Sequence, residues 1–238
     1  MSTRQARNLL LLFYALTAIS LGCLPVMSLH PLYQEKDLAF EKELLGTWVD
    51  GDDPNDSDST WQFARSDDSK KQYQLIVTDE EGRKGIFTAN LVKLDNLLVL
   101  DIHPEKFPSG AETVEDMNLP YNAFFFIPVH TFVKVDFITP IADVGKHIDK
   151  PDPNVLKQLS KNYDYAMVLR LTDDDDFEKI LKQDPNAIAH EKIENHGIIL
   201  TASTKQLQKF VLKYADHDKL FSTDTNLIRK KNSNKNPP

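Results

Sequence analysis

Apolar and polar residues alternate through the middle of the chain, which is the pattern of strands with one buried face. Trp61 and Phe63 lie on either side of a glutamine, and the same alternation runs from Tyr73 to Val77. Turn-forming residues separate the segments that follow by only a few positions, so we expect consecutive strands to pair as neighbours. The antiparallel meander predicted in this way has strands at 73–78, 86–94 and 97–102.

More strands are predicted after the segment 103–120, which is rich in proline, glycine and acidic residues and is expected to be a loop. Phe124 to Phe126 and the alternating residues from Val129 to Phe137 predict one long bent strand or two strands joined at Pro128. The last two strands predicted are 166–171 and 197–201.

Apart from a short helical turn predicted at 37–41, helical spacing appears in the second half of the chain. The excursion 141–162 contains a short predicted helix at 155–159, and the acidic run 173–176 is expected to cap a helix around Phe177. Ser203 and Gln206 form a capping box for a further helix, which we expect to pack on the sheet. Its predicted apolar face consists of Leu207, Phe210, Val211 and Tyr214.

About eight alternating strands, joined mostly as neighbours, favour a mainly β (α+β) fold: an antiparallel meander that closes into a barrel, with helices added at the C-terminal end. Gly46-Thr47-Trp48 follows a short turn near Asp37 and resembles the Gly-x-Trp signature at the start of lipocalin and other calycin barrels. The resemblance implies that Trp48 closes one end of the barrel. The alternative is a core tryptophan on the first strand of another β domain.

The N-terminal segment has the organisation of an export signal. Arg4 and Arg7 precede an uncharged apolar run of 13 residues, from Leu9 to Leu21. A membrane-spanning helix needs about 20 residues, so we interpret this run as a cleaved signal rather than a permanent anchor.

The sequence that ends this signal, Ser20-Leu21-Gly22-Cys23, resembles a bacterial lipobox, although leucine is commoner than serine at its first position. The resemblance implies cleavage between Gly22 and Cys23 and acylation of Cys23, which would anchor the chain to a membrane. Leu24 resembles the residue found in lipoproteins of the outer membrane or cell surface, which we favour over the inner membrane. The layout of the chain also resembles bacterial lipoproteins that have no assigned activity. The alternative is an incidental cysteine in an ordinary secretory signal.

These features predict four segments. They are a signal peptide at 1–22, a lipid-anchored tether at 23–36, a barrel domain with C-terminal helices at 37–222, and a disordered polar tail at 223–238.

Composition narrows the function classes further. The 238 residues include 28 Lys+Arg and 36 Asp+Glu, and removing Arg4 and Arg7 with the signal changes the net charge from −8 to −10. This balance argues against a nucleic-acid partner. The single cysteine excludes an internal disulfide and a thiolate zinc site.

Motifs for catalysis and metal binding are missing from the sequence. The seven histidines show neither H-x-H nor H-E-x-x-H spacing, and there is no G-x-S-x-G elbow or P-loop. The acidic segment 50–58 lacks the glycine and the final acid of an EF-hand. We therefore predict no catalytic residue, no metal and no cofactor.

Two functions from different classes remain. In the first, the barrel interior binds a small apolar or amphipathic molecule, with Phe124 and Phe126 as candidate lining residues. In the second, the interior is filled by side chains, and the protein is a structural or interaction module of the cell envelope that binds a protein partner. The space inside the barrel distinguishes the two hypotheses.

Overall fold

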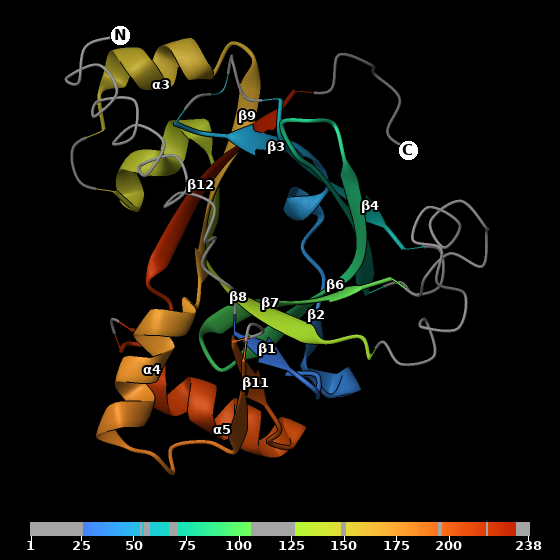
Figure 1. Cartoon of the computed structure of the whole chain (residues 1–238). Helices are drawn as coiled ribbons and strands as arrows, with labels where there is room; N and C mark the ends of the chain where they lie inside the picture. Colours follow the sequence, from blue (N-terminus) through green and yellow to red (C-terminus); the bar gives the residue numbers. More distant parts are fainter. Residues whose placement is uncertain are drawn as a thin grey trace, which may run out of the picture.

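The structure is a computed structural model of the chain, and it describes residues 26–52, 54, 58–66, 71–105, 127–148, 151–194, 197–217 and 219–231. Within this part, eight antiparallel strands form a closed barrel (Figure 1). In their order around the barrel the strands are Gly46–Asp50 (β3), Thr60–Arg65 (β4), Gln72–Thr78 (β5), Lys84–Leu94 (β6), Leu97–Pro104 (β7), His130–Pro140 (β8), Tyr163–Leu171 (β9) and Thr223–Lys230 (β12). The predicted β-barrel with helices is confirmed.

The predicted meander forms most of the barrel wall. Strands β5, β6 and β7 pair in sequence, and a two-residue turn at Asp95-Asn96 joins β6 to β7. Asp95 has a φ of 52°, which is the left-handed conformation that such tight hairpins require. β8 is one strand with a register irregularity between Val135 and Phe137. Residues 124–126 lie outside the described part of the chain.

The strand that closes the barrel was not predicted. β12 pairs with β9 on one edge and with β3 on the other, so the prediction of a disordered tail is wrong for residues 223–230. Only Leu227 and Ile228 of this strand are buried, so the strand shows little hydrophobic periodicity. Backbone pairing on both edges holds it in the sheet. The predicted strand at 197–201 exists as Gly197–Leu200 (β11), but it lies outside the barrel.

The segment predicted as a tether is part of the folded domain from Val26 onward. Met27–Ser28 (β1) pairs between β8 and β11, and Leu32 is fully buried. The Leu32 amide donates to Oδ2 of the buried Asp101 at 2.6 Å. The two prolines of this segment exclude a helix, but they do not prevent these specific contacts.

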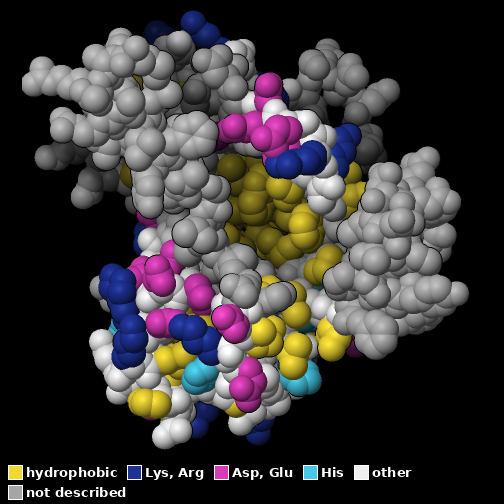
Figure 2. All heavy atoms as spheres, viewed as in Figure 1, with side chains coloured by type: hydrophobic (Ala, Val, Ile, Leu, Met, Phe, Trp, Pro, Cys, Tyr) yellow, Lys and Arg dark blue, Asp and Glu magenta, His cyan; other side chains and the backbone are white. Residues whose placement is uncertain are grey.

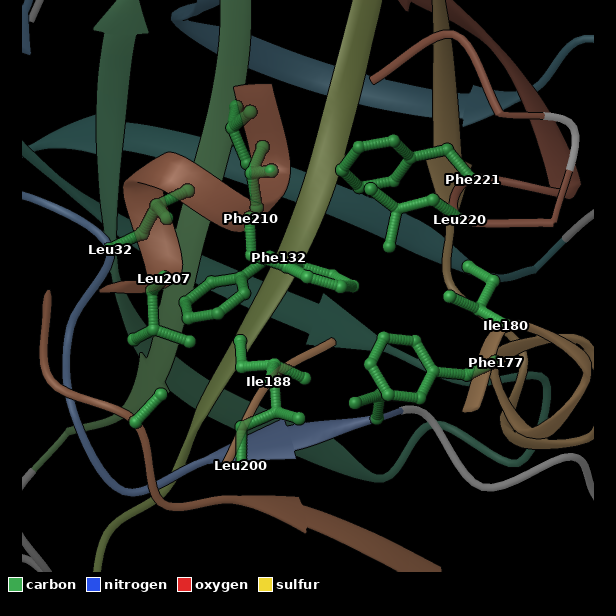
Figure 3. Close-up of a cluster of buried hydrophobic side chains, with 14 of the residues drawn as sticks. Leu32, Phe132, Phe177, Ile180, Ile188, Leu200, Leu207, Phe210, Leu220 and Phe221 are labelled. Atoms are coloured by element: carbon green, nitrogen blue, oxygen red, sulfur yellow. The ribbon is translucent and has the colours of Figure 1, made fainter. Parts of the chain in front are cut away.

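Helices form a second hydrophobic core outside the barrel. Asp174–Gln183 (α4) and Thr204–Tyr214 (α5) lie together on one side of the barrel, and Pro153–Leu159 (α3) lies on the opposite side of the barrel (Figure 1). Figure 3 shows side chains of α4 and α5 meeting around Phe132 of β8. Asp173 caps α4, and Ser203 and Gln206 form the predicted capping box of α5. The remaining elements are the 3₁₀ turns Glu35–Asp37 (η1), Lys42–Leu44 (η2) and Ile141–Lys146 (η4) and the strands Leu38–Ala39 (β2) and His190–Ile193 (β10).

Truncation tests the role of β12. Removing residues 222–238 should prevent folding, because β9 and β3 would each lose a paired edge and the barrel interior would open to water. Removing only residues 232–238 should leave the melting temperature nearly unchanged. Circular dichroism and thermal melting of the two truncated chains provide the measurement, and a cooperative melt of the shorter chain at the wild-type temperature would contradict this role.

Candidate functional site: an apolar cavity in the barrel

The barrel interior has a packed end and an open end. One cluster of inward residues is buried, and it includes Trp48 of β3, Tyr73 of β5, Leu91 of β6 and Met167 of β9. Several inward residues toward the opposite end are only partly buried, namely Trp61, Val77, Phe87, Ile102 and Leu171. We call these two ends the closed end and the mouth.

Trp48 is the largest side chain at the closed end. It has no exposed surface, and its indole Nε1 donates to the Leu44 carbonyl oxygen at 2.8 Å. Phe40 stacks on Tyr73 with a ring-centroid distance of 4.7 Å, and burial raises the pKa of the Tyr73 hydroxyl well above its usual value. The segment 38–45 therefore covers this end of the barrel, and Trp48 occupies the place implied by the calycin resemblance.

Arg229 of β12 fastens the closed end. Its guanidinium binds both carboxylate oxygens of Asp164 at 2.8 Å and donates to the carbonyl oxygens of Glu43 and Leu45 at 2.7 and 2.9 Å. It also lies 5.7 Å from the centre of the Trp48 ring. The guanidinium group is planar and rigid and carries several hydrogen-bond donors, so it can bind the carboxylate and both carbonyl groups at once.

Gly46 makes room for this arginine. Its φ is 126°, a conformation that other residues rarely adopt, and an added Cβ would lie 2.8 Å from Cδ of Arg229. The glycine and the tryptophan of the Gly-x-Trp motif thus contact the same arginine side chain. Arg229 was not predicted from the sequence, because only the closure of the barrel brings it to the motif.

A cavity of about 460 Å³ occupies the mouth half of the barrel. This volume lies in the range of small-molecule sites, which is about 300–1,000 Å³. Figure 2 shows an apolar hollow in this face of the molecule, with charged side chains along part of its rim. The apolar lining residues are Trp61, Leu75, Val77, Phe87, Ile102, Val133 and Leu171.

Two small residues are among those that line the cavity. Gly85 and Thr131 both line the cavity, and an added Cβ on Gly85 would lie 2.6 Å from the ring of Phe87. Gly85 also faces Val77 across the β5–β6 pair. The ring of Phe87 therefore lies over the backbone of Gly85, and the cavity lies beside this ring and Val77.

The rim carries charge on the β5–β6 hairpin. Arg83 forms ion pairs with Asp79 and Glu81, and its hydrogen bond lowers the pKa of the Asp79 carboxyl. Lys84 also lines the cavity and forms no ion pair with any residue that the structure describes. The mouth thus offers one cation whose charge is not matched by a described neighbour.

The predicted site residues divide into two groups. Gly46 and Trp48 are described and form part of the closed end, whereas Gly22, Cys23, Phe124 and Phe126 lie outside the described residues. The cavity-lining residues of the described strands were not predicted as a site from the sequence. Their only signal was β alternation, which is common to every residue that faces the interior.

A separate polar cluster lies on the outer wall of the barrel. Asp101 is fully buried, and its Oδ1 lies 2.6 Å from Nδ1 of His130. The rings of His130 and His103 are 4.9 Å apart. Among the described residues, no group of three or more histidine, cysteine and acidic side chains is arranged to hold a metal ion. The contacts of Asp101 fasten the N-terminal segment to the barrel.

In comparisons with known proteins, no family model, no curated protein and no solved structure matches this chain. In the described part, none of the helices has both the length and the apolar character needed to cross a bilayer.

Trp48 and Trp61 pair across β3 and β4, and they report on the buried closed end and on the adjoining cavity. In a Trp61→Phe variant without residues 1–22, the emission of Trp48 should be blue-shifted and nearly insensitive to iodide, because the indole is buried. The same chain with both tryptophans should be quenched more strongly, since Trp61 lines the cavity. Stern–Volmer plots of the two chains give the comparison, and strong quenching of Trp48 alone would contradict a closed end.

Proposed function

We propose that this protein is a lipid-anchored protein of the bacterial cell envelope that binds a small apolar or amphipathic molecule inside its barrel. The observation that carries the binding part is the apolar cavity at the mouth. An eight-stranded barrel is wide enough either to be filled by side chains or to hold one small ligand. The described side chains fill only the closed end and leave about 460 Å³ at the other.

The anchoring part rests on the sequence of residues 1–23. A short apolar run with a basic start, followed by Gly22-Cys23, is typical of a lipoprotein signal. Diacylglyceryl and N-acyl groups on Cys23 would supply three chains, which exceeds the two signals needed for stable membrane association. We favour the outer membrane or cell surface because of Leu24.

The polarity of the cavity favours a ligand with one polar end. Its wall is apolar, whereas Lys84 stands at the rim with no ion pair to a described residue. An amphipathic molecule would place its chain among Trp61, Val77 and Phe87 and its head at the rim. The competing function, a solidly packed interaction module, needs these side chains to be in contact with one another.

Probe binding tests the cavity. Fluorescence of 12-(9-anthroyloxy)stearate should rise on binding, and the melting temperature should increase with the free probe concentration once it exceeds the Kd. Val77→Phe should weaken binding several-fold, because the larger ring takes cavity space opposite Gly85. Ile76→Phe, on the outer face of the same strand, should bind as the wild type does. Equal affinities for both variants would exclude binding in the cavity.

The charge at the rim predicts which head groups are favoured. Lys84→Glu should weaken binding of the anionic probe several-fold and leave its neutral methyl ester nearly unaffected, because the carboxylate would then face a like charge. The affinity of Lys84→Gln for the acid should lie between that of the wild type and that of Lys84→Glu. Fluorescence titrations at low and high salt provide the measurement, and a loss that is equal for acid and ester would contradict a head group at Lys84.

A further inference from the structure

The first described residues lie at the mouth of the barrel. The amide of Val26 donates to the carbonyl oxygen of Thr172 at 3.5 Å, and Thr172 directly follows the cavity-lining Leu171. Met27 pairs with Thr131, another cavity-lining residue. The chain therefore enters the fold beside the opening of the cavity and not at the closed end.

This entry point is fixed to the barrel by several contacts. Ser28 pairs with both β8 and β11, and the amide of Leu29 donates to the carbonyl oxygen of Leu200 at 2.9 Å. Further along, Leu32 is held by Asp101, and its carbonyl accepts from Nε2 of Gln208 at 2.8 Å. These contacts fix the position of Val26 on the barrel wall beside the mouth.

Only three residue steps separate Cys23 from Val26. At about 3.6 Å per residue in a fully extended chain, they span at most about 11 Å. Acyl groups on Cys23 would enter the hydrocarbon directly beneath the head groups. The closed end lies farther away, because the 11 residues of β6, tilted as in other barrels, rise about 28 Å from mouth to closed end.

From this geometry we infer that the mouth of the barrel faces the membrane and docks on the lipid head groups, so that the cavity opens toward the bilayer. The inference rests on the acylation of Cys23 and the cavity binding proposed above, and it adds an orientation and a lipid surface as partner. A ligand with an acyl chain could then pass between bilayer and cavity without crossing bulk water.

Side chains around the mouth suit this contact. Ile127, just before β8, is 70% exposed, and Ile86 near the start of β6 and Leu29 after β1 are 44% and 38% exposed. The β5–β6 hairpin carries three acids and two cations from Asp79 to Lys84, so it gives no net attraction to anionic lipid. The short connection to Cys23, rather than surface charge, would hold the mouth at the membrane.

Depth-dependent quenching tests the orientation in the full-length, membrane-extracted protein. An introduced cysteine would be the only free thiol, because Cys23 is the one cysteine of the chain and its sulfur is acylated. Glu80→Cys and Asn96→Cys place a nitrobenzoxadiazole label on exposed turns at the mouth and at the closed end. The vesicles contain phosphatidylethanolamine and phosphatidylglycerol, with nitroxide quenchers on a fraction of the head groups.

The label at Glu80→Cys should be quenched several-fold more strongly than the label at Asn96→Cys. A Gly/Ser insert of about 20 residues between Cys23 and Val26, with a root-mean-square span of about 25 Å, should abolish this difference. Transfer of 12-(9-anthroyloxy)stearate from vesicles should accelerate with vesicle concentration for the native spacing and lose that dependence with the insert. Equal quenching of the two labels, or stronger quenching at Asn96→Cys, would overturn the orientation.

Two further measurements separate this inference from the proposed function. Mass spectrometry of the N-terminal peptide tests acylation of Cys23, and equilibrium titration of the same probe tests the cavity. If both succeed while the two labels are quenched equally, the orientation alone is wrong. If the acylated protein binds the probe only after its N-terminal peptide is removed, the anchor's own chain occupies the cavity, and this result also overturns an opening toward the bilayer.

Discussion

An eight-stranded barrel has an interior that is only just wide enough for side chains, so the size of each inward residue determines whether space is filled or left open. At the closed end the inward positions carry Trp48, Tyr73 and Phe63, all of which are buried. At the mouth they include Gly85 and Thr131. One continuous sheet thus provides a rigid core at one end and a binding cavity at the other.

The closed end is also held together by the side chain of Arg229. Arg229 connects β12 to Asp164 of β9 and to the carbonyls of Glu43 and Leu45, so three distant parts of the chain meet at one side chain. The mouth has no comparable fastening among the described residues, apart from the segment that follows Val26. Its hairpin ion pairs are exposed and contribute little to stability.

Local patterns in the sequence predicted most of the wall correctly. The strands β5 to β7 and the caps of α4 and α5 depend on alternation, turns and capping residues, which are close together along the chain. β12 was missed because both of its edges are paired, and its stability comes from β3 and β9 rather than from its own few apolar residues. The same limit applies to the segment 26–36, where burial of Leu32 depends on Asp101 and α5.

The site was predicted only at the Gly-x-Trp motif, where the residue types are unusual enough to be noticed. The cavity is a property of space left between strands, and no single residue indicates it. Val77 and Leu171 have the same alternation as Leu75 and Leu169, yet the first pair is partly exposed in the mouth and the second is buried. Depth along the barrel axis separates them, and depth follows from register and tilt, which the sequence pattern does not specify.

Closure by β12 has a consequence for the order of folding. The hydrogen bond between Arg229 and Glu43 joins residues 186 positions apart, so the final seam can form only after nearly all of the wall has been synthesised and assembled. Contacts with such long sequence separation form late and slowly, because a large loop must be closed first. Until then the sheet has two free edges and no enclosed interior. The cavity therefore comes into existence in the last step of folding, and a ligand can be retained only by a chain that has completed that step.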